Sequence, residues 1–112
     1  MPYRDLAVLD AANRAADLVN ELIDRSPQGR LLHVRQLRDA VQSVVANIRE
    51  GFGRGTGRDR DRPLEIARGE AEEAVGHLAT NFRARRITPR DYWPRRNILI
   101  VVVKMLTAIL NH

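Results

Sequence analysis

The sequence predicts an all-α protein, an antiparallel up-down four-helix bundle in a single domain over residues 1–112. Four segments repeat their apolar residues at alternating intervals of three and four, which is the spacing that lines one face of a helix. Clusters of Gly and Pro separate these segments. A chain of 112 residues has the size of one domain, and short connectors between amphipathic helices favour an antiparallel bundle.

The first two helices are expected over residues 5–25 and 30–50. The apolar stripe of the first contains Leu6, Leu9, Ala12, Ala16, Val19 and Ile23. The stripe of the second contains Leu31, Val34, Leu37, Val41, Val44 and Ile48. The Ser-Pro-Gln-Gly sequence at 26–29 ends the first helix. Gly51 stands just past the second, where a left-handed residue is favoured.

The third helix is expected over residues 61–85, after a loop at residues 51–62. Gly occupies alternate positions from 51 to 57, and such a run does not hold regular structure cheaply. Asp59 or Asp61 is suited to cap the third helix, and Pro63 lies near its first turn. The stripe of this helix contains Leu64, Ala67, Ala71, Val75, Leu78 and Phe82.

A fourth helix is expected over residues 89–111. Thr88 and Pro89 form a typical helix start, while Pro94 is expected to kink the helix or to split off a short first turn. The β-branched run at 98–103 also suits a strand, but no second strand-like segment exists for it to pair with. We therefore expect this run to be helical.

The fourth helix carries apolar residues on more than one face, and a helix that is apolar all round must be buried all round. A single bundle covers only one face, so the second face predicts contact with another copy of the chain. The residues expected at this homo-oligomer interface are Leu99, Val103, Leu106 and Leu110. The alternative is an apolar helix that loops of the same chain cover.

The composition points to an anionic partner. The chain has 18 Arg, one Lys and a net charge of +5, with a pI near 10.9. It has no Cys, which excludes disulfides, Cys-ligated zinc and a Cys nucleophile. The N-terminal segment has no apolar signal region, and no apolar run approaches the roughly 20 residues of a membrane span. We therefore expect a cytoplasmic protein without a membrane partner.

Two groups of Arg are candidate phosphate contacts, and up-down topology places them at opposite ends of the bundle. The group in the Gly-rich loop comprises Arg54, Arg58, Arg60 and Arg62. Its alternative interpretation is a flexible connector. The other group comprises Arg83, Arg85, Arg86, Arg90, Arg95 and Arg96, with Tyr92 and Trp93 as stacking groups for bases. The alternative there is a solvated helix end with Trp93 packed beneath the turn.

No constellation for catalysis, metal binding or a cofactor is apparent, so we expect a non-enzymatic protein. Glu73 and His77 are one helical turn apart, but a di-iron bundle needs a Glu-x-x-His pair on each of two helices. Salt bridges with Arg are the expected use of the acidic residues on the third helix.

The segment from Asn47 to Arg54, Asn-Ile-Arg-Glu-Gly-Phe-Gly-Arg, resembles the Asn-Ile-Ala-Glu-Gly-aromatic-Gly-Arg signature of bacterial four-helix-bundle proteins, also called 23S rRNA intervening-sequence proteins. Residues 36–43 and 67–73 also resemble family segments, although Arg49 and Glu70 replace small residues. Asn47 and Glu50 are expected to hydrogen-bond to the next helix and fix the loop. The motif residues with expected structural roles are Ser43, Asn47, Glu50, Gly51, Gly69 and Glu73.

The resemblance implies a four-helix bundle that assembles into a homopentameric barrel. It also implies kinship with the accessory protein of diversity-generating retroelements, a basic pentamer that partners a reverse transcriptase and binds nucleic acid. We therefore expect an oligomeric bundle that binds RNA or DNA through Arg–phosphate contacts, as an accessory factor to a reverse transcriptase or to ribosomal RNA. The alternative is an adaptor that docks an acidic protein, with nucleic-acid binding incidental.

Overall fold

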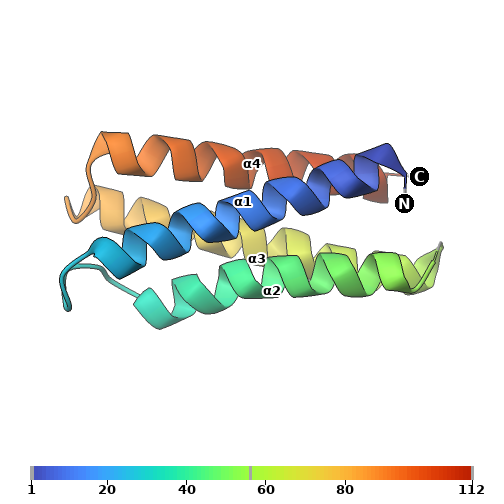
Figure 1. The fold of residues 1–112 in the computed structure, drawn as a ribbon, viewed down its shortest axis with the longest axis horizontal. Helices are drawn as coiled ribbons and strands as arrows, with labels where there is room; N and C mark the ends of the chain where they lie inside the picture. Colours follow the sequence, from blue (N-terminus) through green and yellow to red (C-terminus); the bar gives the residue numbers. More distant parts are fainter. Residues whose placement is uncertain (1, 56, 112) are drawn as a thin grey trace.

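The chain forms an antiparallel up-down bundle of four helices, as the apolar periodicity predicts (Figure 1). The computed structural model describes residues 2–55 and 57–111. The helices are α1 (Tyr3–Arg25), α2 (Val34–Gly53), α3 (Arg58–Arg83) and α4 (Pro89–Leu110). Each helix packs against its two neighbours in the cyclic order α1–α2–α3–α4, and the molecule measures 43 × 21 × 18 Å. Within the described ranges no strand is present, and residues 98–103 are helical.

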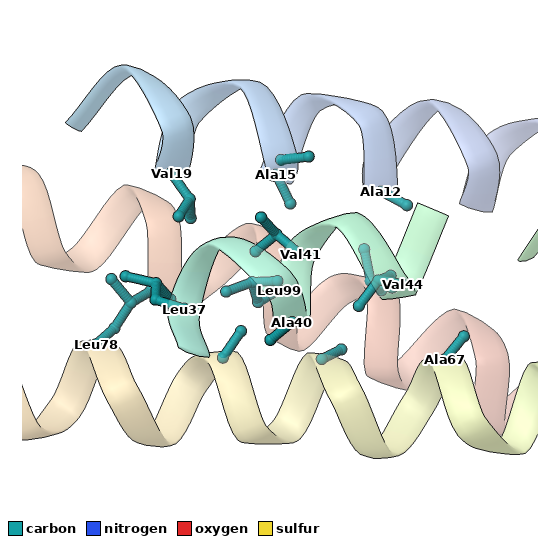
Figure 2. Packing of buried hydrophobic residues seen from close by; sticks show 14 of the residues in the cluster. Ala12, Ala15, Val19, Leu37, Ala40, Val41, Val44, Ala67, Leu78 and Leu99 are labelled. Carbon is teal, nitrogen blue, oxygen red and sulfur yellow. The ribbon is translucent and has the colours of Figure 1, made fainter. Parts of the chain in front are cut away.

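The core runs along the axis of the bundle and is almost entirely aliphatic (Figure 2). Leu37 of α2, Leu78 of α3 and Leu99 of α4 are fully buried in it. Each such Leu contributes roughly 1.5–3 kcal/mol relative to an exposed side chain. Ala12 and Ala40 are also buried, and their small side chains leave room for the neighbouring helices to approach.

The connector between α2 and α3 is much shorter than the loop expected at residues 51–62. Helix α2 continues through Gly51 to Gly53, and α3 already begins at Arg58. Gly51 is helical and buried against Leu64, so the left-handed positions fall instead at Gly55 and Gly57, with φ of 86° and 83°. Thr56, in the middle of this connector, lies outside the described residues.

The helix starts differ from expectation in two places. Helix α2 begins at Val34 rather than at residue 30, because residues 26–33 form a connector that ends in a left-handed His33 (φ 56°). Helix α3 has Gly57 at its N-cap without a side-chain cap, and Asp59 and Asp61 lie in its first turn. Both carboxylates lie near the positive end of the helix dipole, where a negative charge is stabilising.

Helix α4 begins as predicted and is not split by its internal proline. The Thr88 hydroxyl accepts a hydrogen bond from the Asp91 backbone N–H at 3.2 Å. Pro94 lies inside α4, and the helix continues past it to Leu110. Pro94 lacks the backbone N–H that would donate to the Arg90 carbonyl. Arg90 lies in the exposed first turn, so water can donate to that carbonyl instead.

The inward face of α4 consists of Leu99, Val102, Leu106 and Ile109. Leu99 and Leu106 are completely enclosed by the chain's own helices, so their expected place at an oligomer interface is wrong. Val103 and Leu110 are half-buried at the edges of the core, while Val101 is exposed on the outer face. In the part of the chain that the structure describes, no helix is long and apolar enough to cross a membrane.

Candidate nucleic-acid interface

The two Arg groups lie at opposite ends of the bundle, as the topology predicts (Figure 1). The connectors 26–33 and 84–88 share one end, which we call the two-connector end and define as residues 19–40 and 77–96. The connector 54–57 lies at the other end, beside the start of α1 and the finish of α4.

At the two-connector end, the connectors are hydrogen-bonded to each other. The Asn81 amide is buried, accepts from the Leu32 backbone N–H at 2.7 Å and donates to the Leu32 carbonyl at 3.0 Å. The Arg30 guanidinium donates to the carbonyls of Arg85 and Arg86 at 3.0 and 3.1 Å, and Arg86 donates back to the Arg30 carbonyl at 3.3 Å. These bonds fix the backbone from which the neighbouring Arg side chains project.

Arg95, expected to contact nucleic acid, instead joins α1 to α4. Its side chain is only 6% exposed and donates to the Leu18 carbonyl at 2.8 Å and to the Asp91 carbonyl at 3.1 Å. It also forms an ion pair with Glu21. The assignment of Arg95 to a ligand surface is therefore wrong, because its donors are already occupied inside the fold.

A second guanidinium completes this ion network. Arg25 pairs with Glu21 at 2.8 Å and with Asp91 across the α1–α4 contact. Hydrogen bonding to Arg25 lowers the pKa of Asp91 and also lowers the pKa of Glu21, while the carboxylates raise the pKa of Arg25. The network therefore consumes two acids and two bases and leaves no net charge of its own.

Charge at the two-connector end is nevertheless strongly positive. The end contains ten Arg but only four acids, Glu21, Asp24, Asp39 and Asp91. Three of these acids are bound to Arg25, Arg38 and Arg95. Within residues 2–55 and 57–111, the guanidinium groups of Arg83, Arg85 and Arg90 have no hydrogen-bond or ion-pair partner. All three are exposed, so an anion can reach them.

The aromatic residues at this end divide into a buried pair and an exposed indole. The rings of Phe82 and Tyr92 stack with centroids 4.1 Å apart, and Tyr92 is buried. Tyr92 is thus a core residue, and its expected role in base stacking is wrong. Trp93 is 48% exposed, with Arg96 placed 5.9 Å from the centroid of its ring. The alternative of Trp93 packed beneath the turn is therefore wrong as well.

The opposite end of the bundle, where α2 is connected to α3, has fewer Arg side chains free to bind an anion. Arg60 is largely buried, and its Nη1 lies 3.9 Å from a carboxylate oxygen of buried Asp5, so it serves the fold and its assignment to the surface is wrong. Arg54 pairs with Glu50 at 2.5 Å. Arg58 and Arg62 are exposed at the start of α3. Asp59 is exposed beside them and reduces the local positive charge.

The motif residues make contacts mostly within their own helices. The Asn47 amide donates to the Ser43 carbonyl and hydroxyl at 2.9 and 3.0 Å, and Glu50 pairs with Arg54 in the next turn. Neither Asn47 nor Glu50 makes the expected hydrogen bond to the next helix among the described contacts. Of these motif residues, Gly51 is the one whose identity is explained by packing within the chain, since an added Cβ would lie 2.7 Å from Leu64.

The remaining motif positions lie on α3. Gly69 is exposed, with open space where a side chain would stand. Glu73 lies 3.5 Å from His77, whose Nδ1 is 3.2 Å from the Nδ1 of His33. In the described part of the chain, no three His, Cys, Asp or Glu residues are grouped so as to hold a metal ion.

Several residues that organise this end escaped the sequence interpretation. Arg30 and Asn81 tie the connectors together, and Glu21 and Arg25 complete the ion network. The sequence does single out Asn81, because it is a polar residue between Leu78 and Phe82 on an otherwise apolar face, which indicates a buried hydrogen bond. Nothing in the spacing of the charged residues indicates their partners, which are up to 77 positions away.

Comparison with known proteins places this geometry in context. The family model described as "23S rRNA-intervening sequence protein" matches residues 4–108. A crystal structure of a protein of unknown function from the S23 ribosomal protein family of Bacteroides thetaiotaomicron is similar, with a TM-score of 0.89 and 25% identity. The similarity covers 97% of this chain and 99% of that one. The comparison with curated proteins gave no match.

Proposed function

The chain belongs to the family of 23S rRNA-intervening sequence proteins, and we propose that it is a non-enzymatic, cytoplasmic, oligomeric bundle that binds RNA or DNA through phosphate contacts. The family name supports ribosomal RNA as the first ligand to test. The contacts lie at the two-connector end, chiefly from Arg83, Arg85 and Arg90, with Arg86 and Arg96 beside them.

The observation that carries this proposal is the exposed, unpaired charge of Arg83, Arg85 and Arg90. Guanidinium groups without acidic partners attract a polyanion at no cost in broken ion pairs. Because the connectors beneath them are hydrogen-bonded together, the groups lose little backbone freedom when a ligand binds. Few groups at this end suit readout of base edges, so sequence specificity should be weak.

Assembly with further copies of the chain is supported by apolar residues that the bundle leaves exposed. Tyr3 and Leu6 of α1 and Val101 of α4 lie outside the core. An apolar groove between α1 and α4 is lined by Tyr3, Ala7, Met105 and Ala108 and borders this region. We place the oligomer contact here, with a pentamer as the expected state, and Val101→Asp should lower the native mass without loss of helicity.

The test of the ligand proposal is fluorescence anisotropy with a structured RNA, a single-stranded DNA and a duplex DNA across a salt series. The variant R83Q/R85Q/R90Q removes three charges at the two-connector end. Loss of up to three phosphate contacts should lower the slope of log affinity against log salt by about 2–3. Affinity should fall for all three ligands.

The matched control is R14Q/R49Q/R62Q, which removes the same charge from exposed positions away from this end and from the α1–α4 groove. If both triple variants lose affinity equally, net charge alone determines binding and the assignment of the surface is wrong. If the wild-type protein binds none of the ligands at low salt, the proposal is wrong. The adaptor function with an acidic protein partner, such as a reverse transcriptase, then becomes the better interpretation.

A further inference from the structure

Trp93 is the one large apolar side chain exposed at the two-connector end among the described residues. Its neighbours in space include charged and aromatic side chains. Arg90 and Arg96 are each one helical turn away from it on α4, and Phe82 reaches it from α3 with ring centroids 6.0 Å apart. The other exposed apolar residues, Tyr3, Leu6, Ile66 and Val101, all lie outside this end.

The indole is held in a fixed orientation. Tyr92 meets it edge-on at 4.9 Å with an interplanar angle of 69°, and Phe82 meets it at 72°. Because Tyr92 and Phe82 are themselves stacked, the three rings form one cluster that spans α3 and α4. An aromatic platform that is already oriented loses little conformational entropy when a flat ligand stacks on it.

We infer that Trp93 stacks on an unpaired base, so that the two-connector end takes single-stranded nucleic acid or an unpaired loop in preference to closed duplex. This inference rests on the proposed function and narrows its substrate class. A duplex presents phosphates to Arg83 and Arg90 but keeps the flat faces of its bases stacked inside. An unpaired strand offers both phosphate and base, which matches guanidinium groups around an exposed indole.

A protein partner fits this surface less well. Protein interfaces place a contiguous apolar centre within a polar rim, whereas the exposed positions beside Trp93 or one turn from it are Pro89, Arg90, Pro94 and Asn97, without a large apolar side chain. A lone exposed indole beside Arg side chains without acidic partners is instead the combination found where proteins bind single strands.

The chain contains one Trp, so its intrinsic fluorescence reports on this position alone. We would titrate the native protein with a 15-nucleotide oligouridylate, a 15-mer of abasic sites and a blunt-ended duplex. The oligouridylate should quench the indole strongly, while the abasic 15-mer and the duplex should bind with little quenching. Acrylamide should quench the free protein, since Trp93 is exposed.

Substitution then gives the energetic test. Trp93→Leu keeps an apolar side chain against Phe82 and should weaken oligouridylate binding by about 5- to 150-fold. Binding of the duplex and the abasic strand should change less than about twofold, because their phosphate contacts remain. Ile66→Ala, at an exposed apolar residue of α3 outside this end and outside the α1–α4 groove, is the control and should change none of the three.

Two results overturn the inference while leaving the proposed function in place. One is binding of oligouridylate without a change in Trp fluorescence. The other is an equal loss of affinity for all three ligands in Trp93→Leu. Protection of Trp93 from acrylamide in the free protein would also overturn it, because the indole would then be covered by another copy. Absence of binding by all three ligands at low salt would remove both proposals together.

Discussion

Replacing Gly51 by Ala tests how closely α2 and α3 approach. An added Cβ would lie 2.7 Å from Cδ2 and 3.0 Å from Cγ of Leu64, and 3.2 Å from the backbone oxygen of Arg60. Leu64 is fully buried, so it cannot move away without disturbing the core. Overpacking of this kind costs about 1–3 kcal/mol. Removing Gly from a helix returns about 0.5–1 kcal/mol, so the net destabilisation lies between about 0 and 2.5 kcal/mol.

The assay is urea unfolding followed by circular dichroism, at one fixed protein concentration because the proposed assembly would make stability depend on concentration. Gly76→Ala is the control, since the same substitution there meets open space on the surface of α3. It should raise the free energy of unfolding by about 0.5–1 kcal/mol. If Gly51→Ala is as stable as Gly76→Ala, the close packing of α2 on α3 does not exist and the reasoning is refuted.

Three further substitutions test the core and the two-connector end. Leu106→Asp should unfold the bundle, whereas Val103→Asp at its half-buried position should retain helical circular dichroism; equal effects would contradict the assigned faces. Asp91 has a pKa lowered chiefly by Arg25, so its contribution to stability is fully present above the ordinary Asp value of 3.8 and is lost as pH falls below that value through the lowered pKa of the folded state. Asp91→Asn should therefore be less stable than the wild type at pH 7, and the difference should shrink as pH falls further below 3.8 in urea titrations. Asn81→Ala should cost about 2–3 kcal/mol and speed amide exchange in the first connector, and unchanged exchange would show that the connector is held otherwise.

The bundle itself could be predicted because its determinants are local. Apolar spacing of three and four residues identifies each helix, and Thr88 followed by Pro89 marks the start of α4 correctly. The prediction of a loop at 51–62 was wrong because a contact between two helices determines the structure there. Gly51 is disfavoured in a helix by its own propensity, but burial against Leu64 outweighs that cost.

The candidate site could be predicted only in part, because a sequence shows charge but not the partner of each charge. The position of the Arg groups at opposite ends follows from topology. Topology does not show which Arg side chains can bind a ligand. Arg95 pairs with Glu21 and Arg60 with Asp5, and both partners are distant in sequence. Exposure of Trp93 beside buried Tyr92 likewise depends on how α3 and α4 are rotated about their axes.

The shape of the molecule sets the size of its contact with a polymer. The bundle measures 43 Å along its long axis and 21 by 18 Å across it, and the unpaired Arg lie at one end of the long axis. At about 3.4 Å per nucleotide along a strand, one copy that stands on the polymer covers roughly six nucleotides. In the proposed assembly, a longer ligand would contact several copies set side by side, each adding a short footprint. Affinity should accordingly rise with the length of the ligand until every copy in the assembly is engaged.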